Sequence, residues 1–157
     1  MATLKIAWNW RERLAKGDRG AELIEFALVL PLLLLLVLGI VDSAFMFQRL
    51  EVVTNAAREG ARIAVLPSYN TADVRARVNN YLLDGGVPIV AGTNPVINVN
   101  QNFPLASPGG TITAAQVQVT YTHQYMFLSG LASWFGGSFS TVPLNAVSTM
   151  RVEGGGS

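Results

Sequence analysis

The stretch that decides the fold runs from Gly20 to Phe47 and reads GAELIEFALVLPLLLLLVLGIVDSAFMF. It has no charged residue from Phe26 to Val41. A helix rises about 1.5 Å per residue, so the roughly 22 residues from Phe26 to Phe47 would span about 30 Å, which is the thickness of a bilayer's hydrocarbon core. The sequence therefore predicts one transmembrane helix over residues 21–47, around which the rest of the chain is organised.

The chain carries little charge, and that charge is unevenly placed. Charged residues make up 13% of the 157 residues and hydrophobic residues 50%, against about 25% charged in an average soluble protein. The first twenty residues nevertheless form a basic leader, with Lys and Arg at 5, 11, 13, 16 and 19. Positive flanks tend to remain cytoplasmic, so we expect a cytoplasmic N-terminus and an extracytoplasmic body. Nothing in this balance favours a nucleic-acid partner.

The leader, residues 1–20, has the composition of a targeting segment, and Trp8 and Trp10 would suit a membrane interface. A disordered leader is the alternative interpretation. An ordinary secretory signal cut near Ser43 would release a secreted binding domain, but the apolar run is longer than the usual 7 to 15 or so residues of such a signal. Cysteine is absent, which excludes disulfides and thiolate metal sites.

Two motifs frame the apolar run, RGAELIEFALVLP at 19–31 and NAAREGAR at 55–62. Together they resemble the TadE-like pseudopilins of tight-adherence pilus systems. Within the first motif, Gly20-Ala21 with Glu25-Phe26 resembles the processing signature of type IV prepilins, in which a prepilin peptidase cuts after the glycine.

The resemblance implies a minor pilin or pseudopilin, a structural subunit for assembly of a Tad (Flp-type) type IV pilus. Gly20 and Ala21 would be its processing site, and Glu25 and Phe26 its assembly and registration residues. Its expected partners are the prepilin peptidase, other pilin subunits, the inner-membrane assembly machinery and the lipid bilayer. Its expected location is the bacterial inner membrane, as a single-pass protein that can enter a surface pilus.

A physical role for Glu25 follows if the chain is cut after Gly20. Ala21 then gains a charged α-amino group at the membrane edge, and a carboxylate on the same helix or on a neighbouring subunit can neutralise it. Alternatively, Glu22 and Glu25 only complement the positive end of the helix dipole, worth about 0.3 to 1 kcal/mol. Pro31 removes a backbone hydrogen bond and can bend the helix, and Gly39 adds a second flexible point.

The helical pattern continues beyond the membrane segment, and we expect one helix from Ala21 to Leu66, ended by Pro67. It would form the spine of an extracytoplasmic domain, residues 48–153. A stripe of small and apolar residues at three- and four-residue spacing marks its packing face: Val52, Val53, Ala56, Ala57, Gly60, Ala61 and Ala64. Arg58 and Arg62 lie on the other side, either as a solvated basic face or as a dock for another subunit's carboxylate.

The remainder predicts a pilin-like α+β domain. Asn70 to Asp73 is a plausible cap for a second, short helix that ends at Gly85-Gly86. Period-two alternation then predicts strands at 96–101, 115–125 and 142–152, with a turn-rich connection over 102–110. We expect three or four strands in a small antiparallel sheet laid on the spine. The glycine-rich tail, residues 154–157, is expected to be flexible.

A glycine- and aromatic-rich loop is expected between the last two strands, at Leu128 to Ser140. Its large apolar residues are Leu131, Trp134, Phe135 and Phe139. The loop either folds back on the core as a lid or presents a partner contact formed by Trp134, Phe135 and Phe139.

No pattern in the sequence predicts catalysis or a cofactor. His123 is the only histidine, and with no cysteine it lacks companions for an ordinary zinc site. Neither a nucleophile elbow nor a phosphate-binding glycine loop is present. We therefore expect a structural protein and not an enzyme. The alternative function is that of an uncleaved single-pass membrane protein whose outer domain binds an envelope partner or a ligand.

Overall fold

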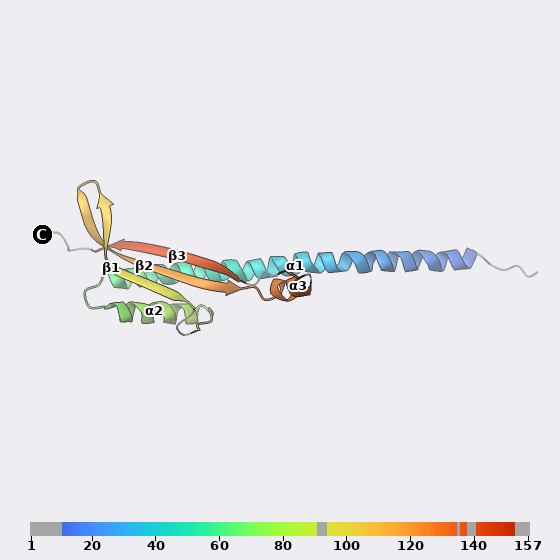
Figure 1. The fold of residues 1–157 in the computed structure, drawn as a ribbon, viewed down its shortest axis with the longest axis horizontal. Helices are drawn as coiled ribbons and strands as arrows, with labels where there is room; N and C mark the ends of the chain where they lie inside the picture. Colours follow the sequence, from blue (N-terminus) through green and yellow to red (C-terminus); the bar gives the residue numbers. More distant parts are fainter. Residues whose placement is uncertain (1–10, 91–93, 135, 138–140, 153–157) are drawn as a thin grey trace, which may run out of the picture. The chain divides into compact units, whose positions relative to one another are not determined.

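A computed structural model of the chain describes residues 11–90, 94–134, 136–137 and 141–152. The chain divides into two compact units, residues 1–40 and residues 41–157. The elements, labelled in Figure 1, are α1 (Arg11–Ala64), α2 (Thr71–Asp84), β1 (Val96–Ser107), β2 (Gly110–Gln124), α3 (Leu128–Trp134) and β3 (Thr141–Arg151). This is the predicted α+β fold. Trp8, Trp10 and the tail at 154–157 lie outside the described residues.

The first unit contains only the N-terminal part of α1, and residues 20–37 are all exposed. The helix runs through Pro31 and already begins at Arg11, ten residues before the predicted start at Ala21. The prediction of a helix start at the end of the leader was wrong, because residues 11–16 (RERLAK) are mostly strong helix formers. A helix that is apolar on all sides and covered by no described part of its own chain is typical of a membrane span.

In the second unit the core lies where the last turns of α1 meet α2 and the sheet. The predicted small-residue stripe supplies this core, with Val53, Ala56, Ala57 and Ala61 essentially inaccessible to solvent. Buried partners come from α2, β2 and β3: Val74, Val78, Leu82, Ala115, Val117, Val119, Tyr121, Leu144 and Ala146. The helix ends at Ala64, two residues before the predicted Leu66, and a turn leads into Pro67.

Helix α2 begins at the predicted cap. The Asn70 side chain accepts hydrogen bonds from the backbone N–H groups of Ala72 (2.8 Å) and Asp73 (3.1 Å), and the Asp73 carboxylate accepts one from the Asn70 N–H (3.0 Å). This reciprocal capping box satisfies donors that the helix itself leaves unpaired. The helix ends at Gly85, followed by Gly86 at φ +72°.

The three strands form an antiparallel sheet in the order β1-β2-β3, with β2 in the centre. The predicted turn-rich connection over 102–110 is wrong, because β1 continues to Ser107 and pairs with Gly110, leaving a two-residue loop. Pro104, opposite Thr113, is tolerated because β1 is an edge strand and needs no partner for the missing N–H. The register shifts between Asn100 and Phe103, where the ladder resumes after an irregularity.

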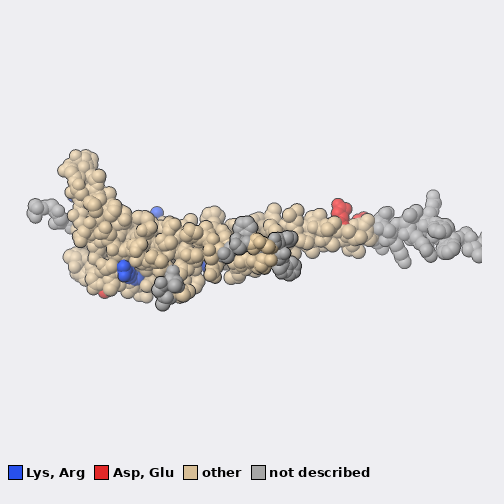
Figure 2. All heavy atoms as spheres, in the orientation of Figure 1, with Lys and Arg blue, Asp and Glu red and all other residues tan. Residues whose placement is uncertain are grey.

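The sheet segment of the chain carries no Asp, Glu, Lys or Arg between Asp84 and Arg151. Charged side chains are accordingly sparse on the face of the molecule shown in Figure 2. Along β2 the inward positions are buried, and the outward ones are mainly Gln and Thr. Apart from Arg151 at the end of β3, the charged residues in the described part of the body therefore lie on α1 and α2.

Gly60 is the closest meeting point of three elements and gives the first prediction. A Cβ at this position would lie 2.6 Å from Val78 Cγ2 of α2 and 3.1 Å from Val117 Cγ1 of β2. We expect Gly60→Val to lower the free energy of unfolding of the body by about 1 to 3 kcal/mol through overpacking. The thermal midpoint, followed by circular dichroism in detergent, measures this effect.

The matched control is Ala76→Val, which places the same side chain at an exposed position of α2. It should change the free energy of unfolding by only a few tenths of a kcal/mol, about the difference in helix propensity. Equal losses in the two variants would contradict the packing account.

Candidate functional site

The motif at the start of the apolar run is fully accessible. An added Cβ at Gly20 would meet no heavy atom within 4 Å. Ala21 and Glu25 are exposed, and Phe26 is 58% exposed although it is a large apolar side chain. This geometry leaves the Gly20-Ala21 bond open to an enzyme and the Glu25 carboxylate open to a neighbouring molecule.

The five residues proposed for helix packing fall into two groups. Pro31 is exposed and Gly39 is half-buried, both in the first unit. Ala57, Gly60 and Ala61 are buried in the core of the second unit, beneath α2 and the sheet. The small residues of the second motif therefore serve contacts inside the subunit, and surfaces left for other subunits lie elsewhere on α1.

The two arginines of the second motif are exposed but differ in their contacts. The Arg62 guanidinium donates two hydrogen bonds of 2.8 Å to the Glu59 carboxylate, and Arg77 of α2 donates to the same Glu59 at 3.0 and 3.1 Å. Arg58 reaches only Asn55, at 3.5 Å. Glu59 thus links α1 to α2, and Arg58 retains more capacity for a partner's carboxylate than Arg62.

The charge cluster shifts the titration of Glu59. The hydrogen bonds from Arg62 are the largest influence on the pKa of Glu59, burial opposes them, Arg77 adds to them, and together they lower it from 4.5 to about 2. The carboxylate therefore stays charged at any physiological pH. Its contribution to stability is present above about pH 4.5 and lost as the pH falls toward 2, and the exposure of both arginines keeps that contribution small.

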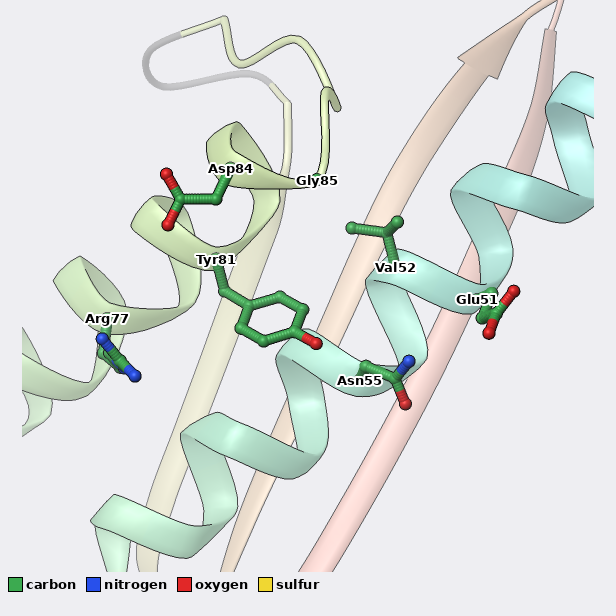
Figure 3. A pocket seen from close by; sticks show the side chains of 7 residues that line it. All are labelled: Glu51, Val52, Asn55, Arg77, Tyr81, Asp84 and Gly85. Carbon is green, nitrogen blue, oxygen red and sulfur yellow. The ribbon is translucent and has the colours of Figure 1, made fainter.

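An open groove of about 430 Å³ lies between α1 and α2, lined by Glu51, Val52, Asn55, Arg77, Tyr81, Asp84 and Gly85. In Figure 3 the Tyr81 ring extends from α2 toward α1, near Asn55. Gly85 lets the end of α2 approach Val52, since a Cβ there would collide with the Val52 Cγ1. The lining mixes both signs of charge, so the groove selects no particular class of ligand.

Asp42 is the functional residue that the sequence analysis missed. Its carboxylate is 1% exposed and accepts hydrogen bonds from three successive backbone N–H groups: Met126 (3.1 Å), Phe127 (3.0 and 3.3 Å) and Leu128 (2.7 Å). These groups precede and open α3. The signal was available, because a lone carboxylate at the end of an apolar helical run is costly unless it is bound by donors.

Two further side chains of α1, Met46 and Arg49, lie one and two turns beyond Asp42, and these three residues are here called the polar row. The Met46 sulfur accepts a hydrogen bond from the Tyr125 hydroxyl at 3.6 Å, and Arg49 Nη1 lies 3.0 Å from His123 Nδ1. Because arginine only donates, Nδ1 must be the acceptor, which assigns the ring proton of His123 to Nε2. Within the described part of the chain Nε2 has no hydrogen-bond partner although it is buried.

His123 is consequently held neutral. Burial, and then the positive charge of Arg49, lower the pKa of His123 below its ordinary 6.5, while Asp42 pulls it the other way. The ring packs edge-on against Tyr125 at 5.3 Å between centroids. His123 lies in β2, at one of its buried positions.

The segment after β2 is more ordered than predicted. The expected loop at Leu128 to Ser140 begins instead with helix α3, whose first N–H groups Asp42 satisfies. Trp134 closes that helix, and Phe135 and Phe139 lie outside the described residues. Among the described residues no group of three or more His, Asp or Glu side chains is placed to hold a metal ion.

Residues 20–62 match the TadE-like protein family. The match covers the second motif and all of the first except Arg19, which confirms the resemblance over that segment, and it leaves out α2, α3 and the sheet. No curated protein and no solved structure matches the chain.

Helix α1 also contains the one candidate membrane span found in the described residues, within Gly20–Ala64, with a mean hydropathy of 2.8 and none of that window buried. By length and composition it can cross a bilayer. Together with the family match, this favours a single-pass membrane protein.

The neutral His123 gives a prediction on pH. The unfolded chain, with an ordinary histidine pKa, binds a proton that the folded chain resists, so stability rises with pH through this range. We expect the thermal midpoint of the body to fall as the pH is lowered from neutral to below about 6.5, the ordinary histidine pKa. Circular dichroism melts across this range measure it.

The chain has a single histidine, so the control is simple. In His123→Gln the melting profile should be flat over the same pH range. A wild-type body that becomes more stable on mild acidification would show that His123 is charged in the fold, contrary to its contact with Arg49.

Proposed function

We propose that the chain is a minor pilin or pseudopilin that assembles into, or primes, a Tad (Flp-type) type IV pilus. It would be inserted in the bacterial inner membrane with a cytoplasmic N-terminus and processed after Gly20 by a prepilin peptidase. The observation that carries the proposal is the exposed, uncharged α1 segment directly following the Gly20–Phe26 motif, inside the family-matched region. The body would then lie on the extracytoplasmic side.

The exposed helix explains how one segment can serve two stages. In the membrane pool its apolar side chains contact lipid, and in the assembly they contact the same segment of sister subunits. Lipid is as apolar as leucine, so exchanging one for the other gains no hydrophobic free energy by itself. The choice of partner must therefore come from close packing and from the few polar groups. Glu25 is such a group, and it directly precedes the uncharged run.

Glu25 supplies such a polar contact once Ala21 carries a free α-amino group. Both charges are expensive in a low-dielectric helix bundle, and pairing them lowers the cost of burying either. A carboxylate reaching the amino group of a neighbouring subunit would fix the relative height of the two helices. The partners of this step are other pilin subunits, held by the inner-membrane assembly machinery.

The test is the intact mass of the protein purified from membranes that contain the peptidase. We expect a chain beginning at Ala21, and full-length protein in Gly20→Leu, because the larger side chain obstructs an otherwise open bond. A wild-type chain that still begins at Met1 would contradict processing and favour the uncleaved single-pass alternative. A start near Ala44 would favour the secreted one.

Assembly is tested separately with Glu25→Gln and the matched Glu22→Gln. Both glutamates are exposed and lie shortly before the uncharged run. If they acted only on the helix dipole, the two substitutions would destabilise the helix by similar small amounts. We expect Glu25→Gln alone to be processed normally yet lost from isolated pili. Equal incorporation of the two variants would remove the registration role of Glu25.

A further inference from the structure

The short segment between β2 and β3 exposes large apolar side chains beside the polar row of α1. Met126 is 64% exposed and Phe127 37% exposed. Residues 125–134, here called the α3 segment, read YMFLSGLASW and contain no charged residue. Exposed Met and Phe next to Tyr and Trp in a charge-free sequence are unusual on a surface that faces only water.

The Asp42 carboxylate holds the α3 segment beside one turn of helix α1. The carboxylate follows the uncharged run from Phe26 to Val41 directly in sequence and binds the N–H groups of Met126, Phe127 and Leu128 at 2.7 to 3.3 Å. The bonds to Asp42 move the far end of the membrane segment back from the predicted Phe47, because a carboxylate that binds the body is costly inside lipid. If the run from Phe26 to Val41, about 24 Å long at 1.5 Å per residue, fills most of the hydrocarbon core, Asp42 stands at its extracytoplasmic boundary. The α3 segment is then held at that same boundary, whatever the orientation of the body.

Several polar groups of the segment are bonded within the protein, which lowers the cost of contact with lipid. Asp42 takes the leading N–H groups, the Ser129 hydroxyl donates to the Tyr125 carbonyl at 2.8 Å, and the Ser133 hydroxyl donates to the Gly130 carbonyl at 2.6 Å. Tyr125 places its own hydroxyl on the Met46 sulfur. Because the two serine hydroxyls donate to carbonyls of the same segment, the segment can present an apolar surface despite its serines.

We propose that the α3 segment lies in the headgroup region of the extracytoplasmic leaflet as a second membrane contact, with Met126 and Phe127 inserted at the acyl boundary. The partner is the lipid surface itself, and the absence of basic residues makes the contact independent of anionic lipid. The inference rests on the membrane insertion in the proposed function, but not on cleavage or pilus assembly. A second copy of the chain fits less well, because two exposed side chains are far fewer than the roughly 20 to 30 residues that each side of a stable protein interface contributes.

The experiment places a single tryptophan probe in the full chain. Trp8, Trp10 and Trp134 are replaced by Phe, and Phe127→Trp is introduced before reconstitution into phosphatidylcholine nanodiscs. Lipid brominated near the headgroup end of one acyl chain quenches tryptophan that sits at that depth. We expect the probe at 127 to be quenched several-fold more strongly than in the matched variant Leu105→Trp.

Leu105 is a close control because its exposure, 37%, equals that of Phe127. It pairs with Ile112 near the start of β2, whereas Phe127 follows the end of that strand, roughly 40 Å away at about 3.3 Å per residue. Equal quenching at 127 and 105 would overturn the proposal. The proposal would also be overturned if the environment of the tryptophan at 127 changed only at a high protein-to-lipid ratio. A second copy of the chain, and not lipid, would then contact this position.

Two further probes keep the result decisive. Leu33→Trp, inside the uncharged run, reports insertion with lipid brominated deep in the acyl chain, so its failure would sink the membrane span itself and not merely the α3 contact. The second is Met126→Trp in the background in which Trp8, Trp10 and Trp134 are replaced by Phe, because Met126 is 64% exposed. Headgroup-depth quenching of this probe is expected, and its absence together with a quenched Leu33→Trp would contradict the proposal alone.

Discussion

The buried carboxylate of Asp42 is the interaction on which the arrangement of the second unit depends. It is almost fully enclosed and bound by three backbone N–H groups from a segment more than eighty residues away in sequence. Hydrogen bonds to a charged acceptor contribute about 1.5 to 3 kcal/mol, whereas a buried charge without donors is strongly destabilising. The carboxylate and the start of α3 therefore have to be placed together.

This constraint explains why a single helix can have two kinds of surface. Up to Val37, α1 presents apolar side chains that no part of the described chain covers. From Ala56 to Ala64 its buried face consists mainly of alanine and glycine, so that α2 and the sheet can approach closely. Between these regions Met46 and Arg49 continue the polar row onto Tyr125 and His123. The second unit begins at Val41, the last residue of the uncharged run.

Much of this could be predicted from the sequence, because it depends on periodicity and local chemistry. The membrane-length run, the stripe ending at Ala64 and the Asn70 cap each show in adjacent residues. The predictions that failed concerned residues whose partners are distant in sequence. The segment containing Pro104 was predicted as a turn because its position on an edge strand was not known. Helix α3 was predicted as a loop because the group that stabilises its start, Asp42, is far away in sequence. The Asp42 carboxylate, at the end of the uncharged run, is a capping group for a distant helix, and only the tertiary structure brings the two together.

The most direct test of this account is amide hydrogen exchange at Phe127 and Leu128 in wild type and in Asp42→Asn, with Asp84→Asn as the exposed carboxylate control. Asparagine keeps one acceptor oxygen but loses the charge and the second acceptor, so we predict exchange at these amides about 10 to 100 times faster. Amides in the centre of β2 should be unaffected, and Asp84→Asn should match wild type. Unchanged protection of Phe127 and Leu128 in Asp42→Asn would contradict the account, because the start of α3 would then be held by something other than this carboxylate.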